Sequence, residues 1–149
     1  ALSHIVAHSC RAKAAIVTRD ERETGDRALL NLGHTLAHAL EAASGYSAGL
    51  LHGEAVAIGM VLAFSLSPTL GLCSQSDADR LVRHLKSVGL PASVSDMRGP
   101  RPAADSLLAH MRHDKKAKDG NLAFILVSGI GQAFACADVK DEQVLEVLS

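Results

Sequence analysis

The chain has 149 residues, of which 48% are hydrophobic and 21% charged, and its formal net charge is -1. This size and composition suffice for one ordinary hydrophobic core without disulfides or repeats. The near-neutral charge argues against a nucleic-acid or membrane-surface partner, because those partners select lopsided basic surfaces. No apolar stretch reaches the roughly 20 residues that span a bilayer, and no signal-peptide pattern opens the chain.

The first half of the chain predicts three helices. Apolar residues at helical spacing indicate a helix over 2–17, already in progress where the chain opens, as expected for a piece of a longer protein. A second amphipathic helix is expected over 27–43 and a third over 53–66. The third contains Glu54 as its only charge, which is typical of a helix packed on most sides, so we expect it at the centre of the fold.

The second half predicts shorter elements. Ser76 followed by Asp79 resembles a capping box and predicts a fourth helix that ends at Val88. The remaining expectations are a short helix over 105–113, a charged loop over 114–121, strands over 122–127 and 133–137 joined by a glycine turn, and a last helix over 139–148. The predicted fold is therefore mainly α, a multi-helix domain with one small β-hairpin.

Histidines concentrate in the second predicted helix and at the start of the third. His34 and His38 lie one turn apart on one face, where two imidazoles can converge on a metal ion, and Glu41 lies one turn further along. His52 follows a loop long enough to fold it back beside the second helix. An isolated histidine is more often hydrogen-bonded than metal-bound, and a pair four residues apart also arises by chance. His52 strengthens the metal hypothesis.

A second group of candidate site residues is cationic. Lys13 and Arg27 flank an acidic bend, and both would lie near the start of the histidine helix if the first two helices pack antiparallel. An Arg fork and a Lys charge near a metal suit a substrate with a carboxylate and a phosphate. Surface ion pairs with Glu21 and Glu23 explain the same pattern equally well. The Lys115–Lys116 pair is typical of a solvated loop.

The order of these residues is similar to the signature of the 3-dehydroquinate synthases. The resemblance rests on the segment 13–60, with its Asn-Leu-Gly-His-Thr-Leu-Ala-His and His-Gly-Glu runs, and on the 89–91 turn and the 111–116 segment that follow in the same order. It covers nearly the whole chain. Ala37 departs from the pattern, because the family usually has glycine there, and an alanine is tolerated on a helix.

The resemblance implies an enzyme of the shikimate pathway. Such an enzyme converts 3-deoxy-D-arabino-heptulosonate 7-phosphate, a phosphorylated sugar acid, into 3-dehydroquinate and phosphate, using NAD and a divalent metal, usually zinc or else cobalt. Family members are commonly homodimers. The chain would be a single helical domain over 1–149, the C-terminal half of a two-domain enzyme whose N-terminal half binds NAD. Gly129 and Gly131 form no dinucleotide fingerprint, because the third glycine and the strand–turn–helix context are missing.

The resemblance also assigns residue roles. His34 and His52 correspond to two metal ligands and His38 to a substrate-contacting histidine near the phosphate, which replaces the His34 and His38 pair that spacing favours. Lys13 and Arg27 correspond to residues that hold the substrate carboxylate. The remaining matches are Asn31 and Lys115, with substrate and phosphate contacts, and Glu23, at the edge of the site.

The family's third metal ligand, a glutamate, falls outside these 149 residues, as does the NAD-binding half. Two protein ligands are fewer than the three that catalytic zinc sites normally have. We therefore expect the chain alone to bind metal weakly and not to turn over.

Two other classes of function remain open. One is a neighbouring sugar-phosphate cyclase or a metal-dependent alcohol dehydrogenase, and the other is a non-catalytic helical module. Lys13, Arg27 and Asn31 favour a phosphorylated, carboxylate-bearing substrate, and a module would have no need of three clustered histidines.

The cysteines carry information about the compartment. Cys10, Cys73 and Cys136 lie far apart, with no CxxC pair, so a disulfide framework or a thiolate zinc site is not expected. A reducing cytoplasm fits this pattern.

Overall fold

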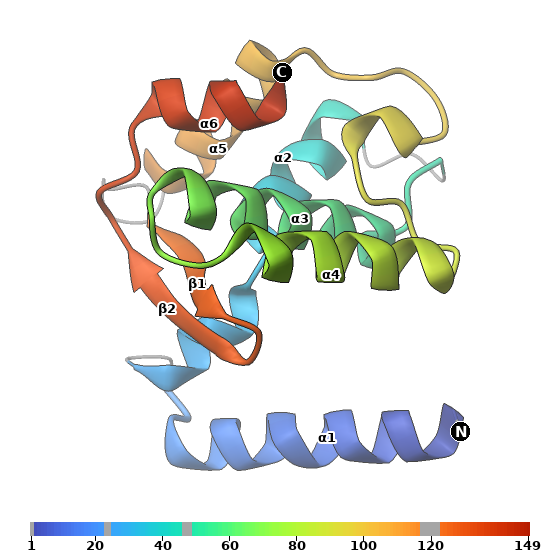
Figure 1. The fold of residues 1–149 in the computed structure, drawn as a ribbon, viewed down its shortest axis with the longest axis vertical. Coiled ribbons are helices and arrows are strands. Elements are labelled where there is room, and N and C mark those ends of the chain that lie inside the picture. The colour runs from blue at the N-terminus through green and yellow to red at the C-terminus, as the bar shows by residue number, and fades with distance from the viewer. Residues whose placement is uncertain (1, 23–24, 46–48, 117–122) are drawn as a thin grey trace. The chain divides into compact units, whose positions relative to one another are not determined.

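A computed structural model describes residues 2–22, 25–45, 49–116 and 123–149 (Figure 1). The chain forms two compact units, Ala1–Asn31 and Leu32–Ser149. The elements in chain order are α1 (Leu2–Arg19), the 3-10 helix η1 (Asp26–Asn31), α2 (His34–Ala43), α3 (His52–Thr69), α4 (Gln75–Ser87), the 3-10 turn η2 (Val94–Asp96), α5 (Ala104–Lys116), β1 (Phe124–Gly129), β2 (Gln132–Cys136) and α6 (Asp141–Leu148). The predicted fold class, mainly α with one β-hairpin, is confirmed, while the single-domain organisation stays a prediction.

The first unit contains α1 and η1. The carboxylate of Asp20, the residue after α1, links the two helices, because its Oδ2 accepts the backbone N–H of Gly25 at 2.8 Å and that of Arg27 at 3.0 Å. α1 itself buries no residue, and Leu2 and Ile5 are 75% and 60% exposed. The apolar face predicted for this helix is therefore present but uncovered in the unit as described.

α3 is the central helix of the second unit, as its composition predicts. It contacts α2, α4, β1 and α6, and Figure 1 shows these elements arranged around it. Its buried side chains lie on several faces and include Ile58, Leu62, Phe64 and Leu66. A helix that is apolar nearly all round is stable only when neighbours cover it on most sides, so α3 organises the core.

The β-hairpin packs on α3, and one polar side chain hydrogen-bonds the two elements. β1 and β2 pair antiparallel, and Gly131 turns the chain between them with a φ of 84°. The hydroxyl of Ser67, a fully buried residue on α3, donates to the carbonyl of Ala63 at 2.8 Å and accepts the N–H of Val127 at 3.1 Å. Because Val127 lies on β1, this hydroxyl connects the strand to the central helix.

The two remaining helices close the other side of the core. Leu107 and Met111 of α5 and Val144 of α6 are buried in the same apolar cluster as Leu66. Arg112 of α5 forms an ion pair with Asp141 at the start of α6. None of the helices in the described ranges is long and apolar enough to cross a membrane.

Several predicted boundaries were wrong. The helix expected over 27–43 is interrupted, because η1 ends at Asn31 and α2 begins only at His34, after a left-handed Gly33. α4 begins at Gln75 after an N-cap at Ser74, where the same Ser-x-x-Asp pattern occurs two residues earlier, and the Ser74 hydroxyl donates to Asp77 Oδ2 at 3.1 Å without bonding a helix N–H.

The third correction concerns the charged loop expected from Asp114. α5 continues through Lys116 instead, and residues 114–116 are helical. The predicted strand start at Leu122 lies outside the described residues. β1 continues to Gly129, two residues beyond its predicted end, and β2 matches its predicted range to within one residue at each end.

Candidate metal and substrate site

The position of the first candidate ligand, His34, is set by two glycines. Gly33 has a φ of 82°, and a β-carbon added to it would lie 2.6 Å from the backbone nitrogen of Met60. A β-carbon added to Gly59 would lie 1.9 Å from the carbonyl oxygen of Gly33. The backbones of α2 and α3 therefore approach so closely that neither position has room for a side chain. His34, the first residue of α2, is held beside the middle of α3 as a result.

Three imidazoles gather around that position. The ring centroids of His34 and His38 are 5.7 Å apart in an edge-on arrangement, and those of His34 and His52 are 5.5 Å apart. His34 is half-buried, whereas His38 and His52 are exposed. The expectation that His52 folds back beside the second helix is confirmed, since His52 Nδ1 also lies 2.9 Å from Oε1 of Glu41 on α2.

These distances fit a metal ion held by two imidazoles. Two imidazoles on one tetrahedral zinc, at about 2.0–2.1 Å per nitrogen, place their ring centroids about 5 Å apart. Both ring pairs come close to this value, so distance alone does not choose between His38 and His52 as the partner of His34. Within the described ranges no three His, Cys, Asp or Glu side chains are placed to hold a metal together.

The cationic candidates belong to the first unit. Lys13 is exposed on α1, and Arg27 lies in η1, where its guanidinium bonds the backbone carbonyl of Glu21. This bond is not the surface ion pair with Glu21 that the charge pattern also allows, because Arg27 bonds the main-chain carbonyl of Glu21 and not its carboxylate. Asn31 is the last residue of η1 and is exposed. The expectation that these residues lie near the histidines stays a prediction.

Two further candidates lie at the edges of the described chain. Glu23 falls outside the described residues. Lys115 lies in the last turn of α5, where the sequence predicts a loop.

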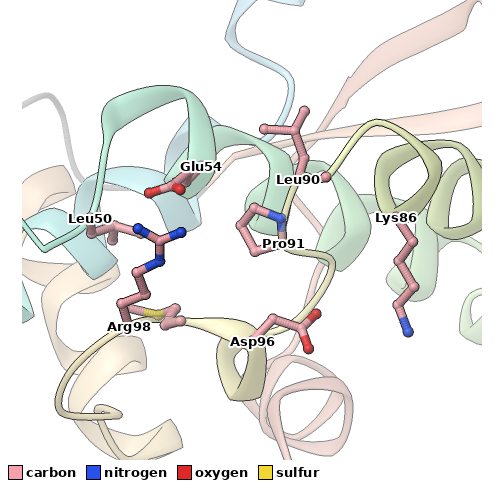
Figure 2. Close-up of a pocket in the computed structure, with 9 residues that line it drawn as sticks. Leu50, Glu54, Lys86, Leu90, Pro91, Asp96 and Arg98 are labelled. Atoms are coloured by element: carbon pink, nitrogen blue, oxygen red, sulfur yellow. The ribbon is translucent and has the colours of Figure 1, made fainter.

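A cavity of about 370 Å³ opens beside the N-terminal turn of α3 (Figure 2). Its polar lining includes Glu54, Lys86, Asp96 and Arg98, and none of the predicted site residues is among its lining. Both acidic residues already accept a hydrogen bond from the backbone. Glu54 Oε2 accepts the N–H of Leu51 at 2.9 Å, and Asp96 Oδ2 accepts that of Ala92 at 2.9 Å.

The capping bond has an electrostatic consequence for Asp96. Hydrogen bonding from the Ala92 N–H stabilises the charged carboxylate and lowers the pKa of Asp96 below its ordinary value of 3.8. Sequence reasoning missed this cavity, because its residues come from three separate segments with no shared motif. The only signal was the turn around Gly89 and Pro91, two residues that line it.

The sequence matches a known family model. Residues 1–117 match the 3-dehydroquinate synthase C-terminal family. Among curated relatives, the 3-dehydroquinate synthase of Ruegeria sp. (strain TM1040) is 62% identical over 143 residues, which are 96% of this chain and 38% of the relative. That of Brucella anthropi is 55% identical over 149 residues, or 99% of this chain and 39% of the relative. The chain thus spans less than two fifths of these relatives.

Two solved synthases have a similar fold. A 2-epi-5-epi-valiolone synthase from Streptomyces hygroscopicus, solved with NAD+ and Zn2+ bound, superposes with a TM-score of 0.81 at 24% identity, over 97% of this chain and 38% of that one. A 2-deoxy-scyllo-inosose synthase complexed with carbaglucose-6-phosphate, NAD+ and Co2+ gives a TM-score of 0.75 at 28% identity, over 93% of this chain and 38% of that one.

Proposed function

The chain belongs to the family of 3-dehydroquinate synthase C-terminal domains, and on that premise we propose that it is the metal- and substrate-binding part of a 3-dehydroquinate synthase. The whole enzyme is a carbon–oxygen lyase that converts 3-deoxy-D-arabino-heptulosonate 7-phosphate into 3-dehydroquinate and phosphate. The observation that carries the proposal is the pairing of His34 with His52, whose ring centroids lie 5.5 Å apart. The similarity to the 3-dehydroquinate synthase of Ruegeria sp. (strain TM1040), which is 62% identical to this chain, also supports the proposal.

His34 and His52 are the proposed protein ligands of a divalent ion, zinc or cobalt. The two similar solved cyclases carry Zn2+ and Co2+, which supports this choice. A bound divalent ion supplies a Lewis acid that lowers the pKa of substrate hydroxyl groups, and NAD, held by the rest of the enzyme, supplies a hydride acceptor. The third ligand is a glutamate outside the 149 residues, so the chain alone binds metal weakly and does not turn over.

The other candidate residues bind the two charged ends of the substrate. Lys13 and Arg27 hold the carboxylate, and a guanidinium suits this task because its N–H groups match two carboxylate oxygens. The remaining contacts are made by His38 near the phosphate, by Asn31 and Lys115 to substrate and phosphate, and by Glu23 at the edge of the site. We also place the enzyme in the cytoplasm, where its three free cysteines stay reduced, and expect a homodimer.

A related cyclase is the second candidate, because the similar 2-deoxy-scyllo-inosose synthase was solved with a sugar-phosphate analogue that has no carboxylate. The two are separated by a chimera in which this chain replaces the matching 143 residues of the Ruegeria relative. We expect it to release phosphate from 3-deoxy-D-arabino-heptulosonate 7-phosphate, and Arg27→Ala to raise KM more than it lowers kcat. Turnover of glucose 6-phosphate, or no phosphate release from the heptulosonate, would contradict the proposal.

A further inference from the structure

We propose that Glu41 is a positioning residue that fixes the tautomer and the orientation of His52, so that Nε2 of this imidazole is presented to the metal. The inference rests on the proposed function, since it takes His52 to be a ligand. The observation that carries it is the 2.9 Å separation between His52 Nδ1 and Glu41 Oε1. Nothing in the spacing of the sequence required these two side chains to meet, because they lie eleven residues apart on different helices.

The chemistry of the pair decides which nitrogen carries the proton. An ionised carboxylate only accepts hydrogen bonds, so the Nδ1 that lies against Glu41 must be the donor. A neutral imidazole with its proton on Nδ1 has its lone pair on Nε2, and a metal binds that lone pair. Carboxylates that orient metal-bound histidines in this way recur in zinc sites, where they also raise the basicity of the ligand.

Burial identifies which partner holds the other. The side chain of Glu41 is 18% exposed, whereas that of His52 is 58% exposed. Glu41 lies on α2, whose neighbouring residues Ala37 and Leu40 are fully buried, so its backbone is fixed in the core. His52 is the first residue of α3 and has little packing of its own to select a rotamer. The half-buried carboxylate is therefore the fixed partner, and the imidazole is the group that it orients.

His34 is oriented by a different group from the one that orients His52. His34 Nδ1 lies 3.4 Å from the backbone carbonyl of Leu32, so its orientation depends on the main chain and on its own partial burial. The other nearby carboxylate, that of Glu54, is engaged by the N–H of Leu51 at 2.9 Å. Removing the Glu41 carboxylate should thus release His52 while leaving His34 and the start of α3 in place.

The test compares the parent chain with Glu41→Ala, the isosteric Glu41→Gln, and Glu146→Gln, which removes one charge from an exposed position on α6. Two quantities are measured on each protein. The first is the tautomer of His52 in the metal-free chain at about pH 8, read from the 15N shifts of its ring nitrogens, where free imidazoles are neutral. The second is the dissociation constant for zinc, from competition with a coloured chelator.

We expect the parent and Glu146→Gln to hold the Nδ1–H tautomer and to share one zinc dissociation constant. Glu41→Ala should shift His52 toward the Nε2–H form and weaken zinc binding about tenfold or more, as loss of an orienting partner does in other zinc sites. Glu41→Gln should retain most of both properties, because its amide oxygen still accepts from Nδ1–H. That rescue is not expected of a residue that merely supports the fold.

Two results would overturn the inference: an unchanged His52 tautomer in Glu41→Ala, or a shifted tautomer with an unchanged zinc dissociation constant. Failure of the proposed function looks different. In that case the parent chain takes up no zinc, or His52→Ala binds it as well as the parent, while the tautomer in the metal-free chain still reports whether Glu41 orients His52. If Glu41→Ala does not fold, Glu41→Leu at the same position supplies the variant without a hydrogen-bond acceptor.

Discussion

The carbonyl oxygen of Gly33 lies so close to the α-carbon of Gly59 that a β-carbon on Gly59 would come within 1.9 Å of it. Both glycines are buried, and they join the start of α2 to the middle of α3. This contact places His34 where it can meet His52. The geometry of the proposed metal site thus depends on two residues that carry no side chain.

Gly59→Ala should lower the free energy of unfolding by about 1–3 kcal/mol, because the added methyl group meets backbone that cannot rotate away. The matched control is Gly53→Ala, also in α3, where an added β-carbon meets nothing within 4 Å. That substitution should stabilise by up to about 1 kcal/mol through helix propensity. Urea unfolding of both variants measures the difference, and equal stabilities would show that the two helices do not approach as closely as described.

Ser67→Ala should destabilise the chain by about 1–3 kcal/mol. The substitution leaves the N–H of Val127 buried without the acceptor that it has at 3.1 Å, and an unsatisfied buried donor costs this much. Thr69→Ala is the control, because the Thr69 hydroxyl makes the same bond to the carbonyl four residues back but is exposed and contacts no strand. We expect the control to change unfolding by less than about 0.5 kcal/mol. If Thr69→Ala lowered the free energy of unfolding as much as Ser67→Ala, the contact between Ser67 and Val127 would not explain the loss.

Asp96→Asn should destabilise the chain near neutral pH and progressively less in acid. The N–H of Ala92 lowers the pKa of the folded Asp96 below 3.8, so this carboxylate binds protons less readily in the folded than in the unfolded state. Its stabilising contribution is therefore complete above the unfolded pKa and is lost as the pH falls through the folded pKa. Urea unfolding of parent and variant from about pH 6 to about pH 3 gives the difference. A difference that is constant, or that grows toward low pH, is the contrary result.

The central helix could be predicted from sequence because its signal is local. The stretch from His52 to Thr69 is apolar on all faces, and a helix of that kind is stable only when other elements cover it. The hairpin was predictable for a similar reason, since its alternating strands and glycine turn lie within one short segment.

The interruption before α2 could not be predicted in the same way. A single glycine inside an amphipathic pattern is tolerated at a modest cost, so local propensity favours an unbroken helix through Gly33. The break follows from a contact with Gly59, which lies in another helix and gives no local signal at Gly33. Tertiary packing overrides propensity here.

The candidate site was predictable only in part. His34, His38 and His52 stand out by residue type and spacing, and the structure brings their rings together. Spacing gave Glu41 a place on the histidine face but not its contact with His52, because that contact depends on how α3 begins beside α2. Distances between rings do not separate ligand from substrate contact, so the distinct role of His38 rests on the family resemblance.

The most direct test of the central claim, that His34 and His52 hold a metal ion, is zinc titration of the 149-residue chain and its histidine variants. His34→Ala and His52→Ala should each weaken binding more than Glu41→Ala does, because loss of a ligand costs more than loss of a group that orients one. His84→Ala, at an exposed position on α4, should bind zinc as the parent chain does. Zinc affinity that is unchanged in His52→Ala would contradict the account.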